Sequence, residues 1–212
     1  MRVLLINGSP HEKGSTHTIL REVAGTLENE GIETEIFHIG AGPIRGCCGC
    51  PQCHGSIDGR CAFDDGGVNT AIEKAEKADG FVFGSPVHMA GVTGIMKSFM
   101  DRFFEAGNEF GKRYAFKPAT AVVCCRRAGS TPTFDQINKY FVYSGMMVVP
   151  SQYWNMVHGL SPDEVVQDLE GMQTMRTLGR NMAWMLRLID VGRKSGVPLP
   201  QNEEEITTNF VR

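Results

Sequence analysis

The stretch from Val3 to Thr18 reads VLLINGSPHEKGSTHT, and it predicts a buried strand that ends in an anion-binding loop. Residues 3–6 form a compact aliphatic run, and a loop rich in glycine and hydroxyl groups follows it. In such a strand–loop–helix unit, free backbone N–H groups and the positive end of the helix dipole converge where a phosphate can bind. The helix is predicted by apolar residues at helical spacing: Ile19, Leu20, Val23, Ala24 and Leu27.

The spacing of the loop glycines narrows the choice of ligand. A P-loop has four residues between its glycines and then Lys-Ser/Thr, whereas here five residues separate Gly8 from Gly14 and Ser15 stands at the lysine position. A Gly-x-Gly-x-x-Gly dinucleotide fingerprint is broken at Pro10. The remaining donors suit one terminal phosphate monoester, and FMN is the obvious ligand of that kind. They are backbone N–H groups and the hydroxyls of Ser9, Ser15, Thr16 and Thr18. An ordinary strand-to-helix turn is the alternative that this stretch leaves open.

Composition and charge limit the class of protein. The 212 residues, 42% hydrophobic and 21% charged, predict one globular domain, placed at residues 1–194 and followed by a tail at 195–212. A net charge of −3 gives no electrostatic case for nucleic acid or an anionic membrane as a partner. Because Met1-Arg2-Val3 leads directly into a core strand without a signal-peptide pattern, we expect a cytoplasmic protein.

Strand-like and helix-like segments alternate along the chain, which predicts an α/β fold. The expected strands cover residues 3–6, 33–39, 80–84, 119–125 and 146–149, and the second has the alternation of a half-exposed edge strand. This order predicts a doubly wound, five-stranded parallel sheet with helices on both faces. A long cysteine-rich insertion, residues 40–67, follows the second strand. Since ligands bind at the carboxyl ends of such strands, the unusual turns after the first, third and fourth strands are expected to meet there.

Two further signals predict helix starts. Ser161 is expected to cap one long helix that continues to about Val191, with Glu164 completing a capping box. Asp64 and Asp65 are expected to cap a shorter helix that begins near residue 68, rather than to bind metal.

Several motifs resemble one known family. Residues 7–10 (NGSP), 14–16 (GST) and 84–94 (GSPVHMAGVTG), followed by 97–99 (KSF) and 101–103 (DRF), are similar to the NADPH-dependent FMN reductase branch of the flavodoxin-like fold. The cysteine stretch resembles that of its iron–sulfur flavoprotein members. The resemblance covers roughly the first two thirds of the chain. It implies a flavodoxin-like sheet, FMN as cofactor, reduction by a nicotinamide, and a homodimer or homotetramer.

The resemblance also implies where a flavin would bind. The family commonly has tyrosine at the position of His88, so the substrate choice of this chain is open, as is the alternative that His88 is an exposed loop residue without a role. The phosphate is expected at Ser9, Ser15 and Thr16, in a loop whose His11, Gly14 and Thr18 we also count as cofactor-binding residues. The isoalloxazine ring is expected against Pro86, Val87, His88, Met89 and Gly91.

The turn after the fourth strand adds positive charge to the same edge. Reduced flavin carries negative charge around N1 and the C2 carbonyl, and a guanidinium or backbone N–H there stabilises it. We therefore predict that Arg126 or Arg127 faces the flavin, with Cys125 and Gly129 in the same pocket; a solvated arginine loop is the alternative. Cys124 is expected to be a small core residue.

Five of the seven cysteines fall between residues 47 and 61. In a reducing compartment such a cluster is typical of metal binding or redox chemistry rather than of structural disulfides. The spacing C-x2-C-x2-C-x7-C suits a [4Fe–4S] cluster, with Cys48 as the spare thiol, and an exchange of roles between Cys47 and Cys48 is left open. A zinc site assisted by His54 and a metal-free loop remain alternatives. The predicted cluster ligands are Cys47, Cys50, Cys53 and Cys61.

These observations predict an FMN-dependent oxidoreductase. It would take electrons from NAD(P)H, or from a ferredoxin, and pass them to a quinone, a free flavin or another small acceptor. A non-enzymatic flavodoxin-type electron carrier is the main alternative, and the small net charge gives it weak support, because carriers dock through strongly charged faces. A redox or metal sensor is a third possibility.

Overall fold

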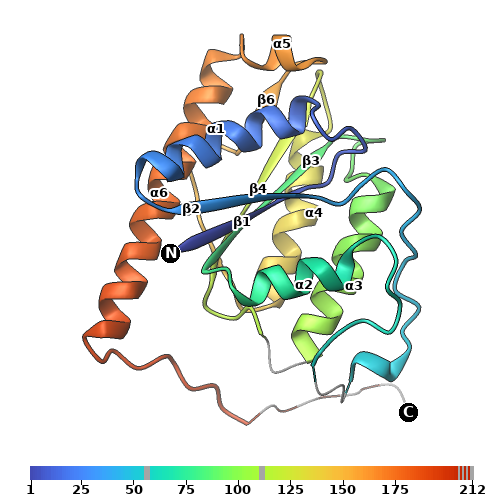
Figure 1. The fold of residues 1–212 in the computed structure, drawn as a ribbon, viewed down its shortest axis with the longest axis vertical. Coiled ribbons are helices and arrows are strands. Elements are labelled where there is room, and N and C mark those ends of the chain that lie inside the picture. Colours follow the sequence, from blue (N-terminus) through green and yellow to red (C-terminus); the bar gives the residue numbers. More distant parts are fainter. Residues whose placement is uncertain (55–57, 110–112, 205, 207, 209, 211–212) are drawn as a thin grey trace.

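The computed structural model describes residues 1–54, 58–109, 113–204, 206, 208 and 210, and Figure 1 shows their arrangement. The remaining residues, which include parts of the expected cysteine-rich loop and tail, lie outside this description. The described chain forms one parallel sheet with helices on both of its faces.

The sheet has the strand order β2-β1-β3-β4-β5, and β6 also pairs with β4. All of these pairs are parallel, so the predicted doubly wound α/β architecture is confirmed. The strands are β1 (Arg2–Asn7), β2 (Glu33–His38), β3 (Gly80–Pro86), β4 (Pro118–Cys125), β5 (Met147–Val148) and β6 (Met156–His158). The helices are α1 (Ser15–Asn29), the 3₁₀ helix η1 (Pro51–Cys53), α2 (Val68–Glu76), α3 (Gly94–Glu109), α4 (Ser130–Tyr143), α5 (Pro162–Val165) and α6 (Leu169–Lys194).

The two faces of the sheet build two separate cores. Successive side chains of a strand point to opposite faces, so Leu4 and Ile6 of β1 pack with α2, α3 and α4. Val3 and Leu5 pack on the other face with α1 and α6. Because all four side chains are almost fully buried, β1 lies in the middle of the molecule, as its aliphatic run predicts. Strand β2 lies at the sheet edge and is half-buried, which confirms the edge position expected for it.

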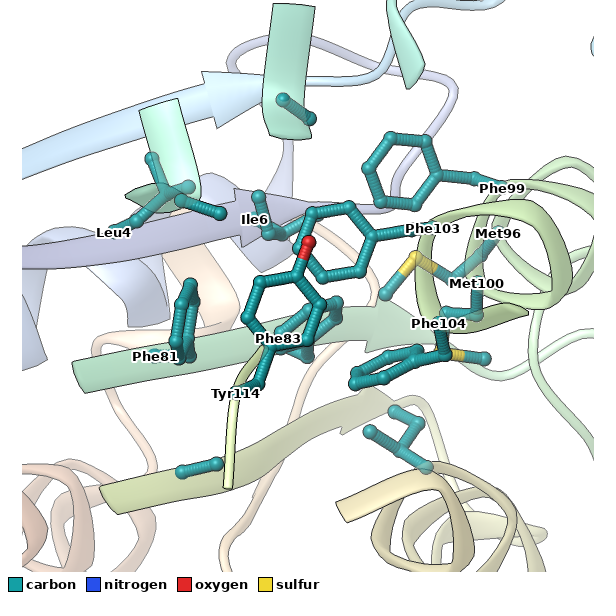
Figure 2. Packing of buried hydrophobic residues seen from close by; sticks show 14 of the residues in the cluster. Leu4, Ile6, Phe81, Phe83, Met96, Phe99, Met100, Phe103, Phe104 and Tyr114 are labelled. Atoms are coloured by element: carbon teal, nitrogen blue, oxygen red, sulfur yellow. The ribbon is translucent and has the colours of Figure 1, made fainter. Parts of the chain in front are cut away.

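Aromatic rings from β3 and α3 fill the core beneath α2, α3 and α4 (Figure 2). The Phe103 ring stacks on Tyr114, with centroids 4.8 Å apart and planes 6° apart. It also contacts Phe83, Phe99 and Phe104 at centroid distances of 5.8, 5.6 and 5.1 Å. The apolar face expected for this helix is therefore core, and it fixes α3 against the sheet.

The fifth strand differs from the prediction, because it is split into two short pieces. Proline cannot donate a ladder hydrogen bond, and Pro150 lies two residues after the end of the first piece. Between the pieces, the Asn155 side chain donates to Thr120 Oγ1 at 2.9 Å and to the Ala121 carbonyl at 3.1 Å, replacing backbone pairing. Strand β6 then resumes beside Val123–Cys125. The strand therefore reaches the carboxyl edge about ten residues later than the expected end at Val149.

The long C-terminal helix is also divided, so the expectation of one helix from Ser161 to Val191 was wrong. Ser161 does cap α5, where its Oγ accepts from Glu164 N–H at 3.3 Å, but the Glu164 carboxylate accepts from Leu160 N–H rather than closing a box on Ser161. The second helix starts because Asp168 caps it, accepting from Gly171 N–H at 3.0 Å and from His158 N–H at 2.7 Å. Neither α6 nor any other helix in the described part of the chain is long and apolar enough to cross a membrane.

Gly8 fixes the loop after β1 against β3. Its N–H donates to the Gly84 carbonyl at 2.8 Å, and a Cβ added at Gly8 would lie 2.9 Å from that oxygen and 2.5 Å from Met96 Sδ. We therefore expect Gly8→Ala to lower the free energy of unfolding by about 1–3 kcal/mol, the cost of an overpacked core. Urea unfolding of the apoprotein measures this.

Gly25→Ala is the matched control. Gly25 lies inside α1 with no atom within 4 Å of the added Cβ. Alanine there is expected to stabilise the chain by about 0.4–1 kcal/mol, because it restricts the unfolded state and favours the helix. Equal responses at both positions would contradict the close approach of Gly8 to Gly84.

Candidate functional site

One cavity at the carboxyl ends of the strands brings together the unusual turns singled out in the sequence. The loop after β1, the turn after β3, the end of β4 and the loop after β6 each supply part of its wall. The lining residues are Ser9, Pro10, His11, Ser15, Thr16, Pro86, Val87, His88, Cys124, Cys125, Arg126, Gly159 and Leu160. The expected convergence of the three turns on one edge is confirmed.

The loop after β1 is held in shape by its own hydrogen bonds. The buried Asn7 accepts from Ser9 N–H at 3.1 Å and donates to the Glu12 carbonyl at 3.0 Å. Ser9 Oγ accepts from His11 N–H at 3.0 Å, and the His38 ring nitrogen Nε2 lies 2.8 Å from the Ser9 carbonyl oxygen. The loop is thus preorganised, and the Ser9 hydroxyl proton is left to donate to another group.

The start of α1 leaves hydrogen-bond donors without acceptors at this cavity. Gly14 is the N-cap and offers no side chain, and the first turn has no acidic residue to satisfy its N–H groups. Within the described residues, Thr16 Oγ1 is buried and has no hydrogen-bond partner. A buried hydroxyl of that kind costs free energy unless a ligand pairs with it. This set of donors fits a phosphate group at a helix N-terminus.

The turn after β3 is a strained hairpin. His88 and Gly91 exchange both backbone hydrogen bonds, at 2.9 and 3.0 Å. Between them, Met89 and Ala90 take positive φ angles of 50° and 57°, which non-glycine residues rarely adopt. Gly129, with φ 86°, packs so closely that an added Cβ would lie 2.8 Å from Ala90 Cα. The turns after β3 and β4 are therefore one packed unit.

Two buried cysteines form the apolar floor of the cavity. Burial raises the pKa of Cys124 to about 12, and burial also raises the pKa of Cys125. Both thiols are therefore neutral at physiological pH and act as small, uncharged wall residues. The sequence indicated Cys125 for this pocket but not Cys124.

Not every residue predicted for the flavin site lines this cavity. The Thr18 hydroxyl lies 3.4 Å from the Gly14 carbonyl, inside the helix, and Met89 is fully exposed. Arg126 lines the cavity and Arg127 does not. Three of the predicted glycines lie in the turns around the cavity and do not line it: Gly14, Gly91 and Gly129. Four lining residues were not predicted: Pro10, Cys124, Gly159 and Leu160. The last two follow β6, the continuation of the fifth strand, which its sequence pattern does not indicate.

A second cavity is lined by all five clustered cysteines. Cys53 is buried, whereas Cys47 and Cys48 are exposed. Burial raises the pKa of Cys53, and the neighbouring Glu105 carboxylate and the thiols of Cys61 and Cys47 raise it further. The lining residues are Cys47, Cys48, Cys50, Cys53, Cys61, Ala62, Phe63, Arg102 and Glu105. Within the described residues no three His, Cys, Asp or Glu side chains converge closely enough for a ready-made metal site.

Near the cysteines, Asp65 differs from its predicted role as a helix cap, and His54 lies outside the cavity wall. Asp65 does not cap α2, whose N-cap is Gly67; its carboxylate accepts from the Arg102 guanidinium at 2.5 Å and from Arg45 N–H at 2.8 Å. Hydrogen bonding to Arg45 N–H lowers the pKa of Asp65, and Arg102 adds to this effect. His54, the possible zinc ligand, places its Nε2 3.2 Å from Glu105 Oε1 and is not part of the cavity wall.

Comparison with known proteins supports a flavin-binding assignment. The family model described as NADPH-dependent FMN reductase matches residues 1–161. An iron–sulfur flavoprotein of Methanocaldococcus jannaschii is 33% identical over 194 residues, covering 89% of this chain and 99% of that protein. An iron–sulfur flavoprotein of Archaeoglobus fulgidus is 36% identical over 178 residues, covering 83% of this chain and 86% of that one.

Solved structures support the fold. The crystal structure of RosB with bound 8-demethyl-8-formylriboflavin-5'-phosphate superposes with a TM-score of 0.71. The match covers 99% of this chain and 92% of that chain at 16% identity. The predicted flavodoxin-like form of the parallel sheet is therefore confirmed.

Proposed function

The chain belongs to the NADPH-dependent FMN reductase family, and from this membership we propose that it is an FMN-dependent oxidoreductase. It takes electrons from NAD(P)H or from a ferredoxin and passes them to a quinone, a free flavin or another small acceptor. The observation that carries the proposal is the buried Thr16 hydroxyl, which has no hydrogen-bond partner among the residues that the structure describes. It lies at the start of α1, in a cavity at the carboxyl edge of the sheet.

The residues present fit FMN. The hydroxyls of Ser9, Ser15 and Thr16 and the first N–H groups of α1 would hold the phosphate. When bound, FMN supplies two-electron chemistry through its N5 atom. Pro86, Val87 and His88 offer a wall for the isoalloxazine ring. We assign Met89 and Gly91 of the same hairpin to its edge, where the strained backbone keeps the turn in one conformation.

Arg126 supplies the positive charge of the site. Its position in the cavity wall allows its guanidinium to stabilise negative charge on the reduced cofactor and so to favour reduction. Cys124 and Cys125 line the same cavity with neutral thiols, because burial raises the pKa of both. Arg127 and Gly129 complete the turn that carries Arg126.

Replacing Thr16 by valine tests the phosphate site. We expect about 10- to 100-fold weaker FMN binding, because a hydrogen bond to a charged group is lost. The stability of the apoprotein should be unchanged or higher, since that hydroxyl has no partner without ligand. Fluorescence titration of apoprotein with FMN measures the first effect and thermal unfolding the second.

Thr26→Val is the control for this experiment. The Thr26 hydroxyl lies on the same helix and donates to the Glu22 carbonyl at 2.9 Å. It should leave FMN affinity unchanged. Equal losses in both variants would show that the effect comes from the helix and not from a phosphate contact.

We further propose that Cys47, Cys50, Cys53 and Cys61 hold a [4Fe–4S] cluster that exchanges electrons with the flavin. Their thiols share one cavity, and thiolates at this spacing are the ligands that such clusters use. The relatives that are named iron–sulfur flavoproteins support the assignment. A zinc ion bound by the same thiolates is the competing occupant.

The proposed function includes an oligomeric state and a cellular compartment for the chain. We propose that residues 1–194 form the catalytic domain and residues 195–212 a tail. Because apolar side chains of the tail are exposed, we propose that the tail contacts another copy of the chain in a homodimer or homotetramer. They include Val197, Leu199, Ile206 and Phe210. All seven cysteines are free, which suits the reducing conditions of the cytoplasm.

The deciding experiment is anaerobic purification followed by an absorption spectrum and turnover assays. Flavin bands and a broad cluster band are expected together, with oxidation of NADPH or NADH in the presence of a quinone. A colourless protein that cannot be reconstituted with FMN would exclude the proposed function. A flavin-containing protein that turns over with neither NADPH nor NADH would favour the alternative, a non-enzymatic electron carrier. Turnover of a small acceptor with reduced ferredoxin would instead identify ferredoxin as the donor.

A further inference from the structure

Arg102, on the buried face of α3, is a charged residue that the flavin site does not use. Its side chain is only about 1% exposed, and a buried guanidinium is costly unless its charge and its donors are satisfied. All three of its nitrogens donate. Nε donates to Cys61 Sγ at 3.2 Å, Nη1 to Asp65 Oδ1 at 2.5 Å, and Nη2 to the Phe63 carbonyl.

These partners belong to the segments that flank the clustered cysteines. Nη1 also lies 3.4 Å from the Arg45 carbonyl oxygen, just before the first cysteines, while Cys61, Phe63 and Asp65 follow the others. Arg45 also contacts the segment after the cysteines, because its guanidinium carbon lies 4.5 Å from the centre of the Phe63 ring. One side chain of α3 therefore ties both ends of the cysteine-rich loop to the core.

Cys61 is held at its backbone as well as at its sulfur. Its N–H donates to Asn69 Oδ1 at 2.9 Å, and Asn69 Nδ2 donates back to its carbonyl at 3.0 Å. With Arg102 on the sulfur, both the position and the direction of the Cys61 side chain are fixed. Cys47, in contrast, is exposed. Of the four predicted ligands, Cys61 is thus tied to α2 and α3 through Asn69 and Arg102, and Cys53 is buried at the end of η1.

We propose that Arg102 is a positioning residue of the cysteine site: it holds the Cys61 thiol in place as a ligand and remains hydrogen-bonded to its sulfur when a cluster is bound. This inference rests on the proposed [4Fe–4S] cluster. Partners of this kind orient metal ligands, and hydrogen bonds to ligand sulfur raise the reduction potential of a cluster. A lysine has one nitrogen and cannot reach Cys61, Phe63 and Asp65 together.

The test compares Arg102→Lys and Arg102→Gln with wild type, and uses Arg176→Gln as the matched control. Arg176 pairs with Glu22 at 2.5 Å between α6 and α1, away from the cysteines. In the metal-free chain, hydrogen exchange at the Cys61 amide should become about tenfold faster in both Arg102 variants, as expected for loss of a hydrogen bond to a charged group. In the reconstituted chain, iron should be lost to a chelator about 10- to 100-fold more readily, and the cluster potential should move to more negative values.

The outcomes separate this inference from the proposed cluster. Wild-type exchange and iron retention in the lysine variant would overturn the role of Arg102, and so would equal losses in Arg176→Gln. If Arg102→Gln does not fold, the lysine variant, which keeps the charge beside Asp65, decides alone. If wild type takes up no iron and sulfide, the proposed cluster is wrong, and exchange at Cys61 in the metal-free chain still decides whether Arg102 holds that thiol.

Discussion

Replacing Cys50 by alanine is expected to remove nearly all iron and acid-labile sulfide from the anaerobically purified chain while its FMN content stays unchanged. A [4Fe–4S] cluster needs one thiolate for each iron, and the other three predicted ligands cannot complete the set. The flavin is expected to remain, because the residues that line its cavity do not include any of the clustered cysteines. Iron and sulfide analysis together with the flavin spectrum measures both effects.

Cys48→Ala is the matched control, because Cys48 lines the same cavity but falls outside the C-x2-C-x2-C-x7-C spacing. It should retain the cluster. If the Cys50 variant keeps its iron and the Cys48 variant loses it, the ligand set is wrong and Cys48 belongs in it. Zinc without sulfide in wild type would show that the site is a zinc site.

Phe103→Ala should lower the free energy of unfolding by about 3–5 kcal/mol. The ring is buried among Phe83, Phe99, Phe104 and Tyr114 (Figure 2), so its removal loses apolar burial and leaves a cavity that rigid neighbours cannot close. The stacked Tyr114 loses most, since its ring is parallel to that of Phe103. Urea unfolding of the metal-free apoprotein measures the change.

Tyr143→Ala is the matched control on the surface. Tyr143, at the end of α4, is 74% exposed, and its replacement should change stability by less than about 0.5 kcal/mol. A cost below about 1 kcal/mol for Phe103→Ala would mean that the aromatic core relaxes to fill the space, and it would contradict the tight packing described for α3.

The cavity at the carboxyl ends of the strands was largely predictable from the sequence because its walls follow strands with clear patterns. Val3–Ile6 and Phe81–Phe83 read as buried strands, and in a parallel sheet their carboxyl ends meet at one edge. The last wall was not predictable in this way. The expected fifth strand stopped at Val149, and its continuation depends on tertiary contacts: the Asn155 side chain bonds to Thr120 and Ala121, and β6 then pairs with the end of β4.

The cysteine site shows where sequence spacing stops being informative. The spacing predicted that the thiols share one centre, and the structure places them around one cavity, but Cys48 lines it too. The sequence indicated Arg102 only as part of a motif that resembles the family, with no role at the cysteines. Its partner Cys61 is 41 positions away in sequence, and no local periodicity relates the two. Likewise, Asp65 looked like a helix cap because its pairing with Arg102 depends on tertiary structure.

The divided fifth strand has a consequence for how this molecule behaves at high concentration. An exposed sheet edge can pair with the edge of another molecule and lead to aggregation. Here one edge is broken into pieces of two and three residues, too short to template a neighbouring strand. The opposite edge, β2, carries an exposed glutamate and a second glutamate paired with Arg2 and Lys74. Neither edge strand therefore offers a long, uncharged backbone to which a strand of another molecule could pair.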